Sequence, residues 1–411
     1  MIPVCLYFQA HQPYRLRPYG YFDVGREHDY FDGAANREIL ARVSERCYRP
    51  VTRMLLRLLD RHADFAVSFS VSGCLLDQLR DFEPDVIAAF ADLARTGRAE
   101  FLAETSHHSL AWIVSRVEFE DQVALHGRML RELLGVTPRV FRNTELIYAD
   151  ALARWADQRG YAGTLADGVP ALLGPRSPRH VYRAPAPSAI GILTRDYRMS
   201  DDIAFRFSDR SWTDYPLTAP KYDGWVSGAE GEVLSLFMDL ETLGEHQRAE
   251  TGIFEFLEAW VGLHLARPGA RFVTPSQAVA QLPRGGVVSS PDLLSWADDA
   301  RDLSAWQGNE LQRDALARLF ALEPRVKASG SSGLLADFRR LTTSDHYYYM
   351  ATPNASSGSL SADAKVHAYF SPWESPYEAY MTFRHVVADL EGRLDRPRRA
   401  RRPSREQHTA P

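Results

Sequence analysis

The chain has 411 residues, 45% of them hydrophobic and 25% charged, which are ordinary values for a globular protein. A net charge of −5 gives no reason to expect nucleic acid or an anionic membrane as a partner. The three cysteines, Cys5, Cys47 and Cys74, have no metal-ligand spacing, and no apolar run approaches the roughly 20 residues that cross a bilayer. The first residues are typical of a strand and not of a signal peptide, so we expect a cytoplasmic protein.

Through the first two thirds of the chain, short β-branched or aromatic runs alternate with stretches whose apolar residues recur at helical spacing. The predicted strands are Pro3–Gln9, Phe65–Val71, Ala99–Glu104, Arg139–Glu145, Ala162–Ala166, Ile190–Thr194, Glu232–Leu240 and Arg271–Thr274. The clearest helices between them are Arg37–His62, Val117–Leu134 and Glu250–Ala266. Such alternation builds a parallel sheet with helices outside it. Seven or eight strands over about 275 residues favour a β/α barrel, with an open doubly wound sheet as the alternative.

From about Pro291 the pattern is helical only. The predicted helices there are Glu310–Leu322, Gly333–Met350 and Tyr377–Leu394. We therefore expect a β/α barrel over residues 1–284 and a helical domain over residues 285–395 that packs on the barrel. Residues 396–411 combine arginine and proline without apolar periodicity, which predicts a disordered basic tail. A solvated tail is favoured over one that binds nucleic acid.

Polar residues stand where five of the predicted strands end. In parallel β/α folds the reacting groups lie just beyond the C-terminal ends of the strands, on one rim. The residues in these places are His11; Ser72 and Gly73; Glu104, His107 and His108; Glu145; and Asp239 and Glu241. Chance would place polar residues after one or two strands, whereas five cases predict a functional site on that rim.

Glu145 and Asp239 are the strongest candidates for catalysis. Each follows a run that should be buried, which places its carboxyl group at the mouth of the sheet. Hydrolysis of a glycosidic bond needs two carboxyl groups, one to attack or to activate water and one to protonate the leaving oxygen. The alternative interpretation is structural: each acid caps its strand or pairs with an arginine such as Arg142.

Histidines and one tryptophan offer further candidates. His11, His107 and His108 invite a metal interpretation, but the chain has no HxH or HExxH motif and no Asp-Asp pair after the first strand. Hydrogen bonds from these histidines to sugar hydroxyls are therefore favoured, with a structural role as the alternative. Trp306 lies in a polar loop before a helix, a place suited to stacking on a sugar ring, although most tryptophans belong to the core.

Five segments of the chain form one set of motifs. They are His11–Tyr14, Ser72–Leu76, Asn143–Tyr148, Met238–His246 and Leu303–Asn309. With them the chain resembles glycoside hydrolase family 57, in particular its α-amylase branch, from about Pro3 to Leu394. The resemblance implies a distorted (β/α)7 barrel followed by a C-terminal α-helical domain. It also implies a retaining reaction on α-glucans without a metal or an organic cofactor.

The resemblance gives the two acids separate roles. Glu145 matches the family's nucleophile, and Asp239 matches its proton donor. In a retaining pair we expect the two carboxyl groups to lie roughly 5–7 Å apart. The chain departs from the family's pattern at His107, where we expect an aromatic residue, and at Gln307, where we expect an aliphatic one.

The sequence thus predicts an α-amylase-like hydrolase of α-1,4-glucans or malto-oligosaccharides, which binds neither nucleic acid nor a membrane. The residues expected to bind substrate are His11, Glu104, His108, Glu241, His246, Trp306 and Asn309. A 4-α-glucanotransferase or branching enzyme stays open, as does a glucan-binding protein whose activity has lapsed. A metal-dependent deacetylase on a related barrel is disfavoured. Chain-length preference, linkage and oligomeric state are left open.

Overall fold

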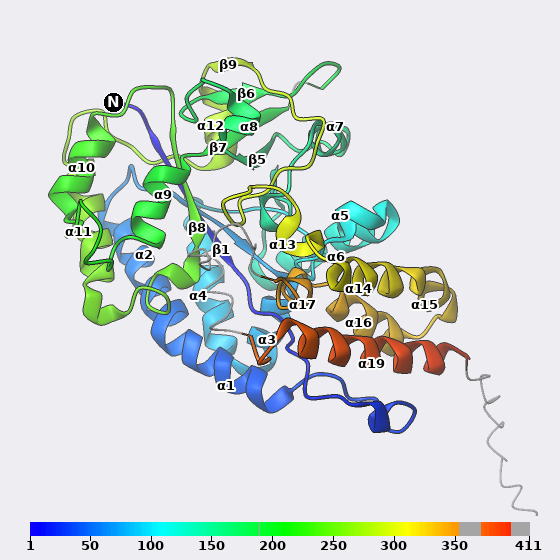
Figure 1. Ribbon diagram of the computed structural model, residues 1–411. Coiled ribbons are helices and arrows are strands. Elements are labelled where there is room, and N and C mark those ends of the chain that lie inside the picture. The colour runs from blue at the N-terminus through cyan, green and yellow to red at the C-terminus, as the bar shows by residue number, and fades with distance from the viewer. Residues whose placement is uncertain (189, 353–370, 396–411) are drawn as a thin grey trace, which may run out of the picture.

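The computed structural model describes residues 1–188, 190–352 and 371–395 (Figure 1). The basic tail expected over residues 396–411 lies outside the described residues. Strands and helices alternate through the first two thirds of the chain, and helices follow alone, as the sequence predicts. The later helices gather on one side of the strands (yellow to red in Figure 1).

One sheet holds four parallel strands in the order β3–β2–β1–β8. They are β1 (Val4–Ala10), β2 (Val67–Val71), β3 (Ala99–Phe101) and β8 (Leu234–Asp239). Gln9 of β1 is paired with Asp239 on one side and with Ser70 on the other. Asp239 therefore stands at the same edge of the sheet as the residues that follow β1 and β2.

A second sheet has the order β4–β5–β7–β6–β9. Its strands are β4 (Val140–Phe141), β5 (Gly163–Asp167), β7 (Gly191–Arg195), β6 (Val181–Arg183) and β9 (Arg284–Val287). The first three are parallel, whereas β6 runs antiparallel to β7 and pairs with β9. The sequence pattern missed β6 and β9 because both are short and β9 contains Gly285 and Gly286. The expected strand Arg271–Thr274 makes only one bridge, between Phe272 and Val4.

Two contacts join the sheets into a barrel. Ala103 forms a parallel bridge with Phe141, which links the chain after β3 to β4. On the other side, the backbone N–H of Asp196 donates to the carbonyl of Ser235 over 2.8 Å, which links β7 to β8. The seven parallel strands of the described chain thus form the distorted (β/α)7 barrel that the sequence predicts, and not the open sheet.

Helices cover the outside of the barrel (Figure 1). Helices α1 (Gly33–Val43) and α2 (Arg49–Arg61) replace the single helix expected over Arg37–His62, because a π-helical turn, Ser44–Tyr48, separates them. Such turns change the direction in which the following side chains point. The other helices of this part are α3 (Gly73–Phe82), α4 (Pro84–Arg95), α5 (Ala111–Val114), α6 (Arg116–Leu134), α7 (Asp150–Gln158), α8 (Pro170–Leu173), α9 (Tyr197–Ala204), α10 (Ala219–Ser227), α11 (Ile253–Leu265) and α12 (Pro275–Gln281).

The helical region follows β9. Its described helices are α13 (Ser304–Gln307), α14 (Glu310–Ala321), α15 (Glu323–Ser329), α16 (Ser332–Leu341), α17 (Ser344–Tyr348) and α19 (Pro376–Asp395). The helix expected over Gly333–Met350 is split into α16 and α17, because Thr343 between them bridges to Ser109 in the loop after β3. Strand β9 spans residues 284 and 285, so the expected domain boundary falls inside a strand.

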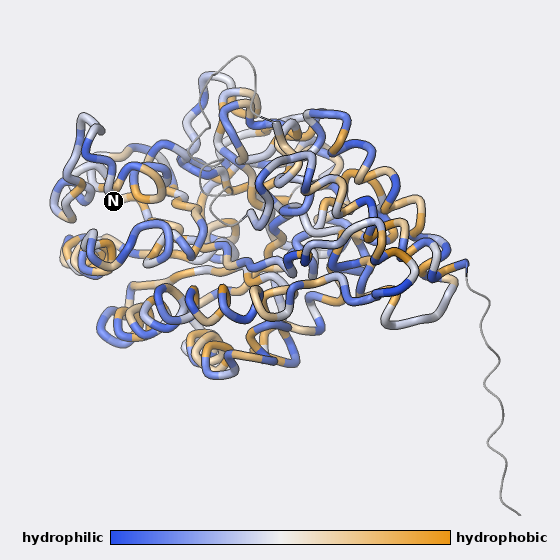
Figure 2. The backbone as a smooth tube through the Cα atoms, turned by 60° about the horizontal axis from the view of Figure 1, so that its bottom comes forward, coloured by the Kyte–Doolittle hydropathy of each residue, from blue (hydrophilic) through white to orange (hydrophobic). Residues whose placement is uncertain are grey.

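The interior of the barrel is filled by side chains. Tyr7 and Phe237 pack edge to face with their ring centres 5.4 Å apart. Around them lie Cys5, Leu102, Val140, Leu165 and Leu193, all fully buried. Room for a ligand is therefore found at the strand ends. Hydrophobic and hydrophilic residues alternate along the helices (Figure 2), and within the described ranges no helix combines the length and the apolar character that a membrane span needs.

Candidate active site

A cavity of about 1020 Å³, its open mouth included, lies at the C-terminal ends of the barrel strands. The residues expected at the site that line it are His11, His108, Glu145, Asp239, Glu241 and His246. They come from different strands, as a site on the rim of a β/α barrel requires. Trp296, Arg301 and Asp345 complete the wall from beyond the barrel, and the strand pattern did not predict them.

Glu145 lies in the tight turn Thr144–Leu146, because β4 ends at Phe141 and not at Glu145 as the sequence pattern predicted. Glu145 and Leu146 have φ angles of 56° and 49°, in the left-handed region, which costs a non-glycine residue on the order of 1–3 kcal/mol. The backbone N–H of Trp296 donates to the Glu145 carbonyl over 3.2 Å, and the N–H of Leu146 donates to the Asn143 carbonyl over 3.0 Å. The turn thereby points the carboxyl group of Glu145, a residue that is 7% exposed, into the cavity.

Hydrogen-bond donors reach both oxygens of the Glu145 carboxylate. The indole N–H of Trp296 donates to Oε2 over 2.8 Å. The hydroxyl of Ser344 donates to Oε1 over 3.0 Å, and Nε2 of His108 lies 3.3 Å from the same oxygen. Donors of this kind favour the ionised form of a carboxyl group.

His108 bridges two carboxylates. Its Nδ1 lies 3.0 Å from Oε2 of Glu104, and its Nε2 lies 3.3 Å from Oε1 of Glu145. Because each nitrogen faces an acceptor, both carry a proton and the ring is a cation. Burial disfavours this charge, but the two carboxylates outweigh it and raise the pKa of His108 to about 9. A positive charge therefore stands beside Glu145 at neutral pH.

Glu104 is fully buried behind His108 and does not line the cavity. The hydroxyl of Ser70 donates to it over 2.8 Å, and the guanidinium of Arg142 lies 3.9 Å away. Burial raises the pKa of Glu104, yet the hydrogen bond and the charge of His108 outweigh burial and bring the pKa down to about 2. The expectation that Glu104 touches substrate is therefore corrected: it supports His108.

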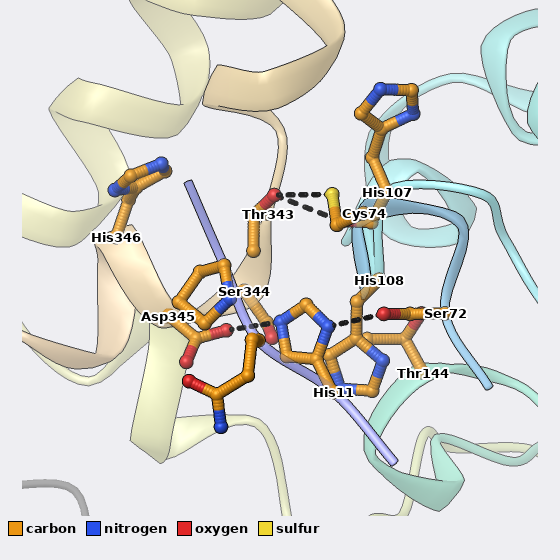
Figure 3. Close-up of polar contacts among 12 residues, drawn as sticks. His11, Ser72, Cys74, His107, His108, Thr144, Thr343, Ser344, Asp345 and His346 are labelled. Atoms are coloured by element: carbon orange, nitrogen blue, oxygen red, sulfur yellow. Dashed lines mark hydrogen bonds and ion pairs between the residues drawn. The ribbon is translucent and has the colours of Figure 1, made fainter. Parts of the chain in front are cut away.

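The ring of His11 stacks on that of His108, with ring centres 4.2 Å apart. Its Nδ1 lies 2.6 Å from the hydroxyl of Ser72, and its Nε2 lies 3.0 Å from Oδ2 of Asp345 (Figure 3). Burial, and then the charge of His108, lower the pKa of His11, so it is neutral, donates from Nε2 and accepts at Nδ1. The ring nitrogens of both histidines are thus engaged by protein groups, against the expectation that they donate to sugar hydroxyls.

Ser72, His11 and Asp345 are the residue types of a serine-hydrolase triad. In such a triad the serine faces the substrate. Here Ser72 is fully buried, and its Oγ also accepts the N–H of Leu75 at the start of α3 over 3.3 Å, so it serves as a helix cap. The described ranges also contain no group of three or more His, Cys, Asp or Glu side chains that could hold a metal ion.

Asp239 and Glu241 stand at the end of β8. Asp239 is the last residue of the strand and is partly exposed to the cavity. Oε1 of Glu241 accepts the Tyr48 hydroxyl over 2.5 Å and the backbone N–H of His11 over 3.2 Å. Burial and the negative charge of Asp239 raise the pKa of Glu241 to about 8. The pair therefore keeps a proton at neutral pH.

Trp296 is the tryptophan that contacts Glu145, through both its backbone and its side chain. Two guanidinium groups lie over its ring, with Cζ of Arg142 at 5.1 Å and Cζ of Arg195 at 5.6 Å from the ring centre. Arg301 donates to the Trp296 carbonyl. The sequence did not single out Trp296, because it lies in an irregular loop without a strand directly before it.

Trp306 and Asn309 do not line the cavity. Trp306 is 1% exposed and packs edge to face on Tyr348 in the helical region. Asn309 caps α14: its Oδ1 accepts the N–H of Gln312 over 2.9 Å, and its Nδ2 donates to the Met350 carbonyl over 2.8 Å. The expectation that these two residues bind substrate is corrected, since both stabilise the helical region.

The amino-acid sequence of this chain matches a known protein family. The sequence profile described as Glycosyl hydrolase family 57 matches residues 5–291. The chain belongs to glycosyl hydrolase family 57. It is 37% identical over 401 residues to a protein of Methanocaldococcus jannaschii described as "Putative alpha-amylase", a match that covers 93% of this chain and 83% of the relative.

Solved structures share the fold of this family 57 chain. A 4-α-glucanotransferase from Thermococcus litoralis is similar with a TM-score of 0.58 and 16% identity over 85% of this chain, which spans only 50% of that longer one. A GH57-type branching enzyme from Pyrococcus horikoshii has a TM-score of 0.66 and 15% identity over 90% of this chain and 87% of its own. At these identities the likeness concerns the fold alone, and it agrees with a barrel followed by helices.

The family 57 profile ends at residue 291, but the site does not. Trp296 and Ser344 lie beyond it and contact Glu145, and Asp345 lies beyond it and contacts His11. The barrel and the helical region therefore build the cavity together.

Proposed function

We propose that this family 57 chain is a retaining glycoside hydrolase of α-1,4-glucans, with Glu145 as nucleophile and Asp239 as general acid and base. The observation that carries the proposal is the contrast between two carboxyl groups on one cavity. Donors hold both oxygens of Glu145, whereas Asp239 stands with Glu241 at the end of β8, where burial and the charge of Asp239 raise the pKa of Glu241 to about 8. Such a contrast separates nucleophile from acid. The name of the Methanocaldococcus relative supports an α-glucan as substrate.

In the first step, a carboxylate oxygen of Glu145 attacks the anomeric carbon. The bond from that carbon to the leaving glucan oxygen breaks, and this oxygen takes the proton of Asp239. The product is a glycosyl ester on Glu145 and an ionised Asp239. The cation of His108 then faces an ester that carries no charge, so it favours the return of the Glu145 carboxylate.

In the second step, Asp239 takes a proton from water. The water oxygen attacks the anomeric carbon, the ester bond to Glu145 breaks, and the sugar leaves with its original configuration. The pair of Asp239 and Glu241 gives up its proton in the first step and regains it from water in the second, and the negative charge of Glu241 favours this uptake. We propose that Glu241 and His246, which line the cavity, contact the sugar. The carboxyl separation of roughly 5–7 Å stays a prediction, as does a cytoplasmic location.

Glu145→Gln tests the proposal. We expect it to lower hydrolysis of maltoheptaose by roughly 10³-fold or more, with thermal unfolding unchanged within a few degrees. Glu45→Gln is the matched control, because the Glu45 side chain is 80% exposed and lies on the π-helical turn. NMR of the first product should show the α anomer. Full activity of Glu145→Gln, or a β anomer, would refute the assignment.

A 4-α-glucanotransferase or branching enzyme is the second candidate, favoured by the structural likeness to proteins with those names. In that case a sugar hydroxyl replaces water in the second step. Maltoheptaose would then give longer and shorter oligosaccharides without new reducing ends, and a new α-1,6 linkage would identify branching. A glucan-binding protein without activity would bind maltoheptaose and release no product.

A further inference from the structure

The helical region is paired with the loop that carries His108. The backbone N–H of Ser344 donates to the His108 carbonyl over 3.0 Å. Thr343 forms an antiparallel bridge with Ser109, and its hydroxyl donates to the His107 carbonyl over 2.9 Å. Figure 3 shows Thr343 facing Cys74, and Ser344 beside Asp345 near His11.

This loop is held in a conformation that side chains rarely adopt. His108 has a φ of 48°, and such a conformation persists only when the surroundings fix it. Helix α3 contacts the loop from the other side, where the N–H of Cys74 donates to the Ser106 carbonyl over 2.9 Å. A Cβ atom at Gly73 would lie 2.5 Å from the same carbonyl oxygen, so only glycine permits this approach. The loop therefore cannot shift without breaking contacts on both sides.

Ser344 reaches Glu145 from this paired segment. It is fully buried, and its hydroxyl donates to Oε1 of Glu145 over 3.0 Å. Nε2 of His108 faces the same oxygen, while Trp296 holds Oε2. The carboxylate cannot rotate about its terminal bond without losing a donor.

We propose that Ser344 is a positioning residue for Glu145: it orients the attacking carboxylate and favours its ionised form. The inference rests on the proposed function, because it takes Glu145 to be the nucleophile. Ser344 lies outside the residues 5–291 that match the family profile, so the role follows from the contacts alone. The titratable and charged groups near Glu145 include His108 beside it, with His11 stacked on that ring and Glu104 behind it. Asp239, Glu241, Arg301 and Asp345 line the same cavity, and Arg142 and Arg195 lie against Trp296.

Threonine and valine at position 344 separate the effect of the hydroxyl from that of the space it fills. Ser344→Thr keeps the hydroxyl and Ser344→Val replaces it with a methyl group, so the cost of added bulk is common to both. We expect kcat of Ser344→Val to be about tenfold below that of Ser344→Thr, with KM nearly equal. We also expect the acidic limb of the kcat/KM profile to move to higher pH in Ser344→Val, because the ionised carboxylate loses a donor.

Ser344→Ala, compared with the unchanged chain, removes the hydroxyl without adding bulk. If thermal unfolding shows that threonine or valine disrupts the fold, the kcat and pH profile of Ser344→Ala provide the test. A lower kcat and a shifted acidic limb in the variants without a hydroxyl support the inference. Equal kcat and superimposed pH profiles overturn it while Glu145→Gln remains inactive. Full activity of Glu145→Gln overturns the proposed function and the inference together.

Discussion

Replacing Trp296 with phenylalanine removes one hydrogen bond to the proposed nucleophile. The indole N–H donates to Oε2 of Glu145 over 2.8 Å. Phenylalanine keeps an aromatic ring beneath the guanidinium groups of Arg142 and Arg195 but has no N–H to donate. Because Glu145 is 7% exposed, water is a poor substitute for the lost donor.

The size of the effect follows from the charge on the acceptor. A hydrogen bond to a charged group contributes about 1.5–3 kcal/mol. Since each 1.36 kcal/mol is about a factor of ten in rate, kcat of Trp296→Phe should fall roughly 10- to 150-fold. Release of reducing ends from maltoheptaose, followed over a range of substrate concentrations, gives kcat and KM separately.

Trp306→Phe is the matched control, since Nε1 of Trp306 is buried without a hydrogen-bond partner in the described part of the chain. It should leave kcat within about twofold of the unchanged chain. Wild-type kcat in Trp296→Phe would refute the assignment, and an equal loss in both variants would show a general packing effect.

Two further predictions concern the proton donor and the histidine cation. Asp239→Asn should abolish hydrolysis of maltoheptaose but still release the phenol of an aryl α-glucoside with an acidic leaving group, because that phenol leaves without a proton; no phenol release would count against the role. The pKa of His108 is about 9 in the fold against 6.5 ordinarily, so its stabilisation is complete below pH 6.5 and is lost as the pH rises through 9. Calorimetry should therefore show Tm falling across this interval, and falling less in His108→Gln; parallel curves for the two proteins would contradict the reasoning.

Local sequence patterns were sufficient for most of the barrel and for part of the site. Seven of the expected strands appear, and Glu145 and Asp239 both line the cavity. The failures have local causes. Strands β6 and β9 are too short to show alternation, and the helix expected over Gly333–Met350 is split because Thr343 pairs with a distant loop.

The sequence pattern selected Trp306, and not Trp296, as the tryptophan of the site for a related reason. Trp296 and Trp306 stand in sequence segments of similar composition, and neither segment indicates what the ring will contact. The structure buries Trp306 in the helical region and places Trp296 on Glu145. The roles of His11 and Glu104 changed likewise once their partners were known.

The sequence by itself determined which polar residues stand at or after the ends of the barrel strands, because alternation and helix periodicity are local properties and the strand ends of a parallel barrel meet on one rim. It did not determine the last residue of each strand, since β3 and β4 end at Phe101 and Phe141. Only the tertiary structure decided which groups hold those residues. Ser344 is 199 residues from Glu145 along the chain, and Asp345 is 334 residues from His11. Contacts at such separations depend on how the helical region packs against the barrel, and packing of that kind leaves no periodic mark on either segment.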